Sequence, residues 1–257
     1  LLDWFRRHGP CAVAFSGGVD STVLLAAART VHPEQTLAVI VDAPWMIRRE
    51  VADARRWVGR RRVRHAVVRI ARVPRELHPN PRDRCLVCKR RLLALIRKTA
   101  GAAGLACLVE GSNRDDARAH RPGRVAVRQC GAASPLHRAG LGKAEIRELA
   151  HRIYRLPQAG RPSESCLATR LAPGSLLTPP ALRRVERMAR ALHREGLHGA
   201  RARDHGALVR IELLDRDTPR MGDPALGRRI RAAGRRAGYG HVTWDLAPRR
   251  PAPGDAP

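Results

Sequence analysis

The strongest structural signal in this chain is the segment Ala14-Phe15-Ser16-Gly17-Gly18-Val19-Asp20-Ser21. The apolar run at residues 11–15 predicts a buried strand, and the Ala- and Leu-rich segment at 19–31 predicts a helix directly after it. Two glycines at such a junction let the backbone approach an anion and adopt positive φ. The first turn of the helix offers free N–H groups and about half a positive charge. Together with the hydroxyls of Ser16 and Ser21, the junction predicts a cradle for pyrophosphate.

The same alternation of strand and helix continues along the first part of the chain. Further strands are expected at 36–41, 63–70 and 105–109, and helices at 46–59, 86–103 and 142–154. Strands that alternate with helices predict a parallel sheet wrapped by helices, a Rossmann-like α/β fold.

The remainder of the chain has a different pattern. Loop-forming residues around 157–162 mark a domain boundary. After it we expect a helix at 178–195 with Thr178 as N-cap and Pro179 at the first position. Two paired strands at 200–203 and 208–213, a helix at 225–237 and a strand at 241–246 complete a small α+β unit. The predicted organisation is therefore domains at 1–157 and 158–247, followed by a disordered Pro-rich tail at 248–257.

Composition limits the classes of protein that the chain can belong to. Its 257 residues suffice for a self-supporting core. No run approaches ~18 apolar residues, so we expect no membrane partner. Six cysteines without a secretory signal predict thiols or ligands in a cytoplasmic protein rather than disulfides.

The net charge of +27 has two explanations. A basic surface attracts nucleic acid, whereas a GC-rich genome favours arginine codons everywhere. Only Lys89, Lys98 and Lys143 are lysines, the arginines are scattered through every segment, and aromatic residues make up 3% of the chain. A single-strand binder needs aromatic stacking platforms. We therefore favour the compositional explanation and expect no nucleic-acid partner.

The phosphate loop is neither a Walker A loop nor a dinucleotide G-x-G-x-x-G. Ser-Gly-Gly-x-Asp-Ser resembles the PP-loop of the ATP pyrophosphatases, which cleave ATP between its α and β phosphates and transfer AMP to a substrate oxygen. The resemblance implies that the loop binds ATP through Ser16, Gly17, Gly18, Asp20 and Ser21. Asp20 then either positions Mg²⁺ or caps the helix. A tight turn without ligand is the alternative.

Further motifs narrow the resemblance to one branch. The stretch 80–89 contains Cys85 and Cys88, and the stretch 161–170 contains Cys166 and Arg170. Together with the segments 111–116, 121–123, 134–136 and 143–150, they resemble the LarE-type sulfurtransferase family over residues 13–246. The chain departs from the family at 119–120, where the family commonly has Asp-Tyr, and at 171–174, where it commonly has an aromatic residue.

The resemblance implies a reaction. The family adenylates the carboxylates of pyridinium-3,5-biscarboxylic acid mononucleotide, and sulfur then displaces AMP to leave thiocarboxylates. The product serves the nickel-pincer nucleotide cofactor of lactate racemase. An acyl-phosphate makes AMP a good leaving group, and a thiolate or hydrosulfide is a strong nucleophile at neutral pH.

The source of the sulfur stays open between two mechanisms. Some members of the family sacrifice the sulfur of one cysteine, which matches Cys166. Others hold a [4Fe-4S] cluster with three cysteines, which match Cys85, Cys88 and Cys166, and the iron without a protein ligand carries sulfide. We favour the cluster; zinc bound with His78 or His120 is the alternative. The other cysteines, Cys11, Cys107 and Cys130, are interpreted as structural.

Charged residues complete the predicted site. Arg201 and Arg203 alternate on an expected strand and so share one face, and the resemblance implies that they hold nucleotide phosphate. Arg170 is expected to stabilise an oxyanion or the AMP phosphate. Glu212 and Asp223 fall where the family has acidic residues and are candidates to hold a metal or the cationic ring.

Two other functions remain alternatives. A tRNA-thiolating PP-loop enzyme would use the positive charge, and a non-catalytic nucleotide- or polyanion-binding protein would use only the loop. For the favoured function we expect a sulfide donor and a homo-oligomer.

Overall fold

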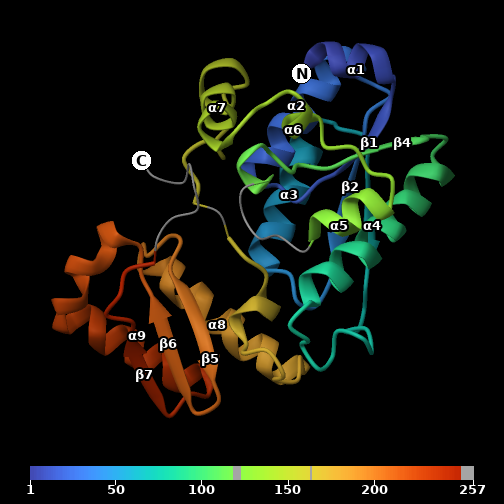
Figure 1. Ribbon diagram of the computed structural model, residues 1–257. Coiled ribbons are helices and arrows are strands. Elements are labelled where there is room, and N and C mark those ends of the chain that lie inside the picture. Colours follow the sequence, from blue (N-terminus) through green and yellow to red (C-terminus); the bar gives the residue numbers. More distant parts are fainter. Residues whose placement is uncertain (118–122, 163, 250–257) are drawn as a thin grey trace.

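The computed structural model describes residues 1–117, 123–162 and 164–249. Its first lobe is built on a four-stranded parallel sheet with the order β3-β2-β1-β4 (Figure 1). The strands are β1 (Cys11–Ala14), β2 (Leu37–Asp42), β3 (His65–Arg69) and β4 (Cys107–Val109). The predicted α/β fold with a parallel sheet is confirmed.

Helices cover both faces of this sheet because alternate strand residues point to opposite sides. Val13 and Ile40 contribute to one core, which is closed by α1 (Leu2–His8), α2 (Val19–Val31), α3 (Arg48–Arg60), α6 (Pro135–Arg138) and α7 (Lys143–Glu148). Ala12 and Val39 contribute to the other core, against α4 (Arg84–Ala102) and α5 (Gly123–Gln129). The result is a three-layer α/β arrangement.

The order of the strands places a crevice between β1 and β4. The chain runs outward from β1 through β2 to β3 and then returns to β4 on the other side of β1. The loops that follow β1 and β4 therefore lie side by side at the carboxyl edge of the sheet, where the strand order reverses. In open α/β sheets this switch point is where ligands bind.

The second lobe is a three-stranded sheet with helices. It comprises η3 (Leu167–Arg170), α8 (Pro179–Arg194), β5 (Arg201–His205), β6 (Leu208–Glu212), η4 (Asp215–Gly222), α9 (Pro224–Ala237) and β7 (His241–Trp244). β5 and β6 form an antiparallel hairpin with Gly206 at φ +76°, and α9 carries the chain to β7, which pairs parallel with β6. The small α+β unit is thus confirmed.

A shared core joins the two lobes under the end of β2. Trp45 and Ile47 pack there with Leu167, Leu177 and Val185. The N–H of Leu167 donates to the carbonyl oxygen of Trp45 at 2.8 Å. The turn that carries Cys166 is therefore anchored to the first lobe.

Local signals predicted most elements within two residues. α2 has the predicted bounds, and Thr178 accepts a hydrogen bond from Ala181 N at 3.3 Å as the N-cap of α8. The helix expected at 142–154 is divided, because α7 continues as a π-helical turn, η2 (Leu149–Ile153). Helices α1, α5 and α6 were not predicted, since these short segments carry weak periodicity.

The segment predicted as a disordered tail contains, near its start, a residue that is hydrogen-bonded to the second lobe. Pro248 and Arg249 were assigned to the disordered tail, yet Arg249 N donates to Leu213 O at 2.7 Å; residues 250–257 lie outside the described residues.

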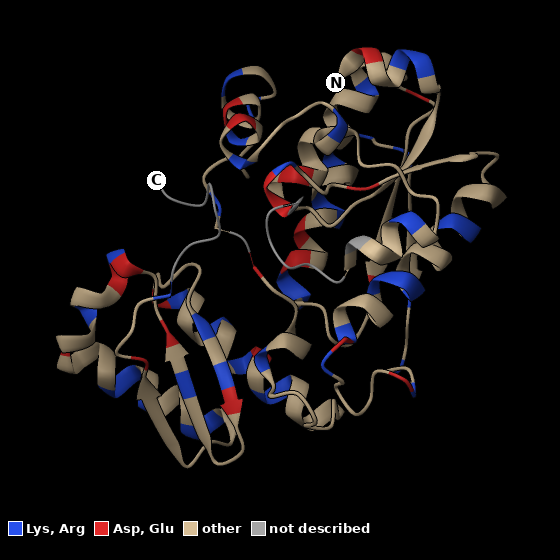
Figure 2. Cartoon of the chain, in the orientation of Figure 1, with Lys and Arg blue, Asp and Glu red and all other residues tan. Residues whose placement is uncertain are grey.

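Figure 2 shows Lys and Arg on elements of both lobes rather than gathered on one element. In the described parts of the chain, no helix has the length and apolarity that a membrane span requires.

Candidate active site

The phosphate loop turns sharply out of β1. Gly17 has φ +80°, and a Cβ atom there would lie 2.9 Å from the Cβ of Ala54 on α3. The hydroxyls of Ser16 and Ser21 lie 3.1 Å apart, and Ser21 Oγ also accepts from Ser16 N at 3.3 Å. Gly18 is the N-cap of α2. The loop is thus held tightly by its own side chains and by α3, and the first turn of α2 faces the crevice.

Asp20 has a partner that its own segment does not reveal. It lies in the first turn of α2, whereas the N-cap position is occupied by Gly18. Its Oδ2 accepts from Nζ of Lys143 at 2.6 Å, and Lys143 is only 7% exposed. Helix capping at the N-cap position is therefore excluded as the role of Asp20, while a role in positioning Mg²⁺ stays a proposal.

A second ion pair stands where β4 ends. Glu110 accepts from Lys89 Nζ at 2.7 Å and from Ser112 Oγ at 2.8 Å, and Ser134 Oγ donates to it as well. Burial raises the pKa of this carboxyl, but Lys89 and the hydrogen bonds lower it below its usual value. The carboxylate stays ionised and fixes Lys89 at the crevice.

The two loops of the crevice touch each other. A Cβ on Gly111, after β4, would lie 3.3 Å from the backbone N of Ser21 and 3.4 Å from Cβ of Asp20. A small residue at this position keeps the first turn of α2 accessible.

The structure brings the three predicted cysteine ligands into one neighbourhood. Cys85 and Cys88 lie in the first two turns of α4, and Cys166 is the N-cap of η3. Cys88 and Cys166 both pack against the core around Trp45 and Leu167. Burial raises the pKa of Cys88 to about 12, and the charges of Cys166 and Cys85 add to the effect. Burial likewise raises the pKa of Cys166.

The trio is not a ready-made metal site. Among residues 1–117, 123–162 and 164–249, no three His, Cys, Asp or Glu side chains stand in a metal-binding arrangement. His120, the alternative zinc ligand, lies outside the described residues. Three neighbouring thiols match the donors that an iron–sulfur cluster needs. They would have to draw together and lose their protons to hold one.

The other cysteines are separate from this group. Cys11 and Cys107 are paired neighbours on β1 and β4, and burial raises the pKa of Cys11 to about 12. Cys130 Sγ lies 3.7 Å from Arg90 O. Their structural interpretation agrees with these positions.

Four arginines gather beside the Cys166 turn. Arg170 is 2% exposed, and its Nη2 donates to Glu164 Oε2 at 3.1 Å. Within the described residues its Nε and Nη1 have no hydrogen-bond partner. Burial lowers the pKa of Arg201 to about 10, followed by the charges of Arg249, Arg170 and Arg203. Guanidinium groups forced together in this way favour an anion between them.

Arg201 and Arg203 share a face of β5, as predicted, but differ in their hydrogen bonds and ion pairs. Arg203 pairs with Glu212, Nε to Oε1 at 2.9 Å, and donates from Nη1 to Thr169 O at 2.7 Å. Arg201 makes no hydrogen bond or ion pair with the residues described. Arg201 is therefore the more available cation.

Three known proteins have sequences that align with most of this chain. No protein-family model matches the chain. An uncharacterized protein of Synechocystis sp. is 31% identical over 251 residues, 96% of this chain and 92% of that protein. The pyridinium-3,5-bisthiocarboxylic acid mononucleotide synthase of Lactiplantibacillus plantarum is 26% identical over 237 residues, 91% of this chain and 84% of the synthase. The similarity to a LarE-type synthase over most of the chain supports the family resemblance that the motifs indicate.

A third relative is more distant. An uncharacterized protein of Methanocaldococcus jannaschii is 26% identical over 208 residues, 79% of this chain and 77% of that protein. These similarities extend over the segments that carry the motifs, while the [4Fe-4S] subtype stays a prediction.

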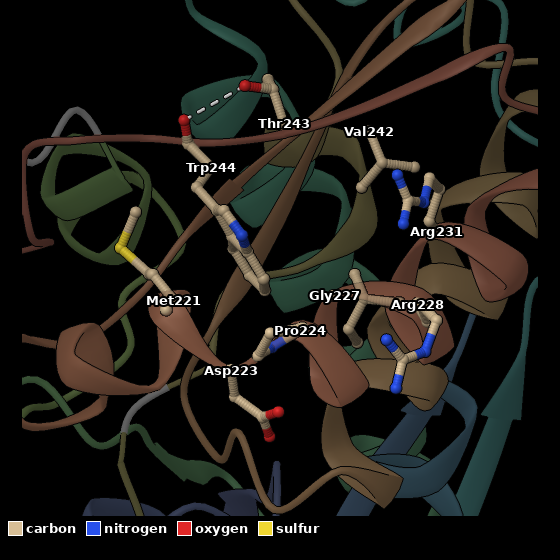
Figure 3. Close-up of a pocket in the computed structure, with 11 residues that line it drawn as sticks. Met221, Asp223, Pro224, Gly227, Arg228, Arg231, Val242, Thr243 and Trp244 are labelled. Atoms are coloured by element: carbon tan, nitrogen blue, oxygen red, sulfur yellow. Dashed lines mark hydrogen bonds between the residues drawn. The ribbon is translucent and has the colours of Figure 1, made fainter.

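Two acidic residues proposed from the LarE family pattern have structural partners. Glu212 pairs with Arg203 and also with Arg210, at 3.3 Å. Asp223 caps α9 by accepting from Ala225 N at 2.8 Å. It borders a pocket of about 340 Å³ between α9 and β7, where the Trp244 indole is directed toward Pro224 (Figure 3). β7 is the edge of the small sheet opposite β5, so Asp223 stands apart from the cysteines.

The sequence patterns assigned no role to Lys143, Lys89 or Glu164, although Lys143 contacts Asp20, Lys89 contacts Glu110 and Glu164 contacts Arg170. One signal was available. Only three of the chain's 50 basic residues are lysines, and the two that are not exposed both pair with acids at the crevice. A compact ammonium in an arginine-biased chain indicates a position where a guanidinium does not fit.

Lys143→Met is expected to lower the free energy of unfolding by about 1–3 kcal/mol, because it removes a cation from a largely buried ion pair. Affinity for ATP should fall as well, since the Asp20 carboxylate then repels phosphate. Urea titration and calorimetric ATP binding measure the two effects. Lys98→Met, on the exposed face of α4, is the matched control. Equal behaviour of the two variants would contradict a role for the Lys143–Asp20 pair.

Proposed function

We propose that this chain is an ATP-dependent sulfurtransferase that converts the carboxylates of pyridinium-3,5-biscarboxylic acid mononucleotide into thiocarboxylates. One observation carries the proposal: the phosphate loop, the cysteine trio and the buried Arg170, whose Nε and Nη1 have no hydrogen-bond partner among the described residues, lie around the carboxyl edge of one sheet. The similarity to the Lactiplantibacillus bisthiocarboxylic acid mononucleotide synthase supports the same chemistry.

ATP binding is assigned to the switch-point crevice. The N–H groups at the start of α2 and the hydroxyls of Ser16 and Ser21 are the donors for its β and γ phosphates. Gly17 and Gly18 let the backbone approach, and Asp20 holds Lys143 and is placed to position Mg²⁺. Attack by a substrate carboxylate oxygen on the α-phosphate then gives an acyl-adenylate and pyrophosphate.

Sulfur transfer is assigned to the Cys166 turn. The buried guanidinium of Arg170 offers two donor atoms to the charge that develops on the acyl oxygen or on AMP. Arg201 and Arg203 hold a nucleotide phosphate. Arg203 binds it while its guanidinium also remains paired with the carboxylate of Glu212. Cys85, Cys88 and Cys166 would hold a [4Fe-4S] cluster, which supplies an open coordination position for sulfide. In the alternative mechanism, Cys166 itself gives up its sulfur.

The test is an anaerobic reaction with ATP, Mg²⁺, sulfide and the pyridinium dicarboxylate mononucleotide, read by mass spectrometry. We expect thiocarboxylate and AMP in equal amounts, and no product with an ATP analogue whose α–β bridge is a methylene group. AMP formed without any thiocarboxylate, by protein that contains its iron or added sulfide, would contradict the proposal. Adenylation or thiolation of added tRNA under the same conditions would favour the tRNA-thiolating alternative.

A further inference from the structure

Glu50 lies between the phosphate loop and the Cys166 turn. It is in the first turn of α3, one helical turn before Ala54, and residues four apart share a face of a helix. Ala54 is the residue that Gly17 approaches. Glu50 therefore stands on the face of α3 that looks toward the loop. Its electrostatic neighbours Glu164 and Arg170 belong to the Cys166 turn.

The charged groups around Glu50 are already engaged with one another. Arg170 Nη2 donates to Glu164 Oε2 at 3.1 Å, and Arg49 Nη2 donates to Glu164 Oε1 at 3.3 Å. Arg49 also lies 3.2 Å from Nε2 of His193 on α8.

Asp53, one turn further along α3, pairs with Arg161 at 3.2 Å and with Arg56. In the described part of the chain, by contrast, the carboxyl of Glu50 has no hydrogen bond or ion pair. Of the three carboxyls of Glu50, Asp53 and Glu164, that of Glu50 is therefore the one available to exchange a proton.

The surroundings also set the proton affinity of Glu50. Burial raises its pKa from the usual 4.5 to about 7, and the charge of Glu164 adds to the effect. Arg49 and Arg170 lower the pKa, and Asp53 raises it slightly. The carboxyl is therefore poised to take up and release a proton near neutral pH, where general acid–base groups work best.

We propose that Glu50 is the proton acceptor of the sulfur-transfer step. The inference rests on the proposed function and adds a residue to it. When hydrosulfide attacks the acyl-adenylate, a C–S bond forms and the bond from the acyl carbon to the AMP oxygen breaks. AMP leaves with that electron pair as a phosphate dianion. The S–H proton passes to the Glu50 carboxylate, which leaves a thiocarboxylate and later returns the proton to solvent.

The activity test compares Glu50→Gln with Asp53→Asn, its neighbour on the same helix. With total sulfide adjusted at each pH to keep the concentration of HS⁻ constant, we expect Glu50→Gln to slow thiocarboxylate formation about 10²-fold and to lose the rise in rate between pH 6 and 8. Exchange of pyrophosphate into ATP, which reports adenylation alone, should stay within about twofold of the wild type. Asp53→Asn should keep both rates and the pH profile.

The outcomes separate the two proposals. A wild-type protein that makes no thiocarboxylate would overturn the proposed function and this inference together. A wild-type protein that makes it, alongside a Glu50→Gln variant with the same rate and pH profile, would overturn the inference alone.

A stability measurement tests Glu50 without any reaction. Because its folded pKa lies above its unfolded value, the folded protein binds the extra proton between about pH 4.5 and 7, and stability should fall as pH rises through that window. Glu50→Gln should remove this part of the slope, so that the variant gains melting temperature relative to the wild type as pH rises from 5 to 8. Parallel curves for the two proteins would show that Glu50 does not hold a proton near neutral pH and would overturn the proposal.

Discussion

Cys166→Ser is expected to reduce thiocarboxylate formation by about 10³-fold or more while pyrophosphate exchange into ATP continues. The serine oxygen can neither donate sulfur nor replace a thiolate ligand of a cluster, so both mechanisms for the sulfur source lead to this result. The phosphate loop and the crevice between β1 and β4 are untouched by the change, since Cys166 belongs to the turn before η3. Anaerobic assays by mass spectrometry, with exchange of labelled pyrophosphate, measure the two half-reactions separately.

Cys130→Ser is the control, because Cys130 lies outside the trio and its Sγ donates to the backbone oxygen of Arg90. Cys85→Ser then separates the mechanisms. A cluster needs Cys85, so multiple turnover and the iron–sulfur absorption band should both be lost. A sacrificial Cys166 predicts a single turnover in the Cys85 variant, with the protein lighter by one hydrogen sulfide. Undiminished thiocarboxylate formation by Cys166→Ser would contradict both mechanisms.

Gly17→Ala is expected to reduce the rate of ATP-dependent adenylation by about 10²-fold, because a small displacement of the phosphate-binding backbone has effects of that size. Two physical obstacles act together. The backbone at Gly17 has φ +80°, which costs a residue with a Cβ roughly 1–3 kcal/mol. The added methyl would also lie 2.9 Å from Cβ of Ala54, so the loop and α3 must separate. Pyrophosphate exchange and urea unfolding measure the two consequences.

The matched control is Gly59→Ala on α3. A Cβ there meets nothing within 4 Å, and alanine is favoured over glycine inside a helix by about 0.5–1 kcal/mol. That variant should be slightly more stable than the wild type and fully active. If Gly17→Ala retained wild-type exchange, the close packing of the loop against α3 would not matter for ATP use.

The order of elements followed from local signals in the sequence. β1, the glycines and α2 are contiguous, and each depends on residues a few positions apart: an apolar run, residues that tolerate positive φ, and a helix with few breakers. The same holds for Thr178 and Pro179 at the start of α8. Such patterns act within one turn or one strand, so they can be recognised without knowing what packs on them.

Partners of individual charges could not be predicted in this way. Glu212 was a candidate for a metal or a cationic ring, and its carboxylate pairs with Arg203, diagonally across the β5–β6 hairpin, and with Arg210 on its own strand. Asp223 was a candidate for the same roles, and its carboxylate caps α9. A lone carboxylate looks the same in the sequence whether it binds a ligand, an arginine or a backbone N–H.

Local sequence patterns were enough to predict the α/β architecture, the phosphate loop and the residue types of the proposed sulfur-transfer site. Which of these residues come into contact depends on the packing of segments that are far apart in the chain. Lys143 reaches Asp20 across 123 positions of the chain, and the pKa of Glu50 depends on the charges of Glu164 and Arg170, more than a hundred residues later. The reason is physical: the parallel sheet gathers the ends of distant strands at one edge. Burial and charge at that edge, which set each proton affinity, depend on all of those segments at once.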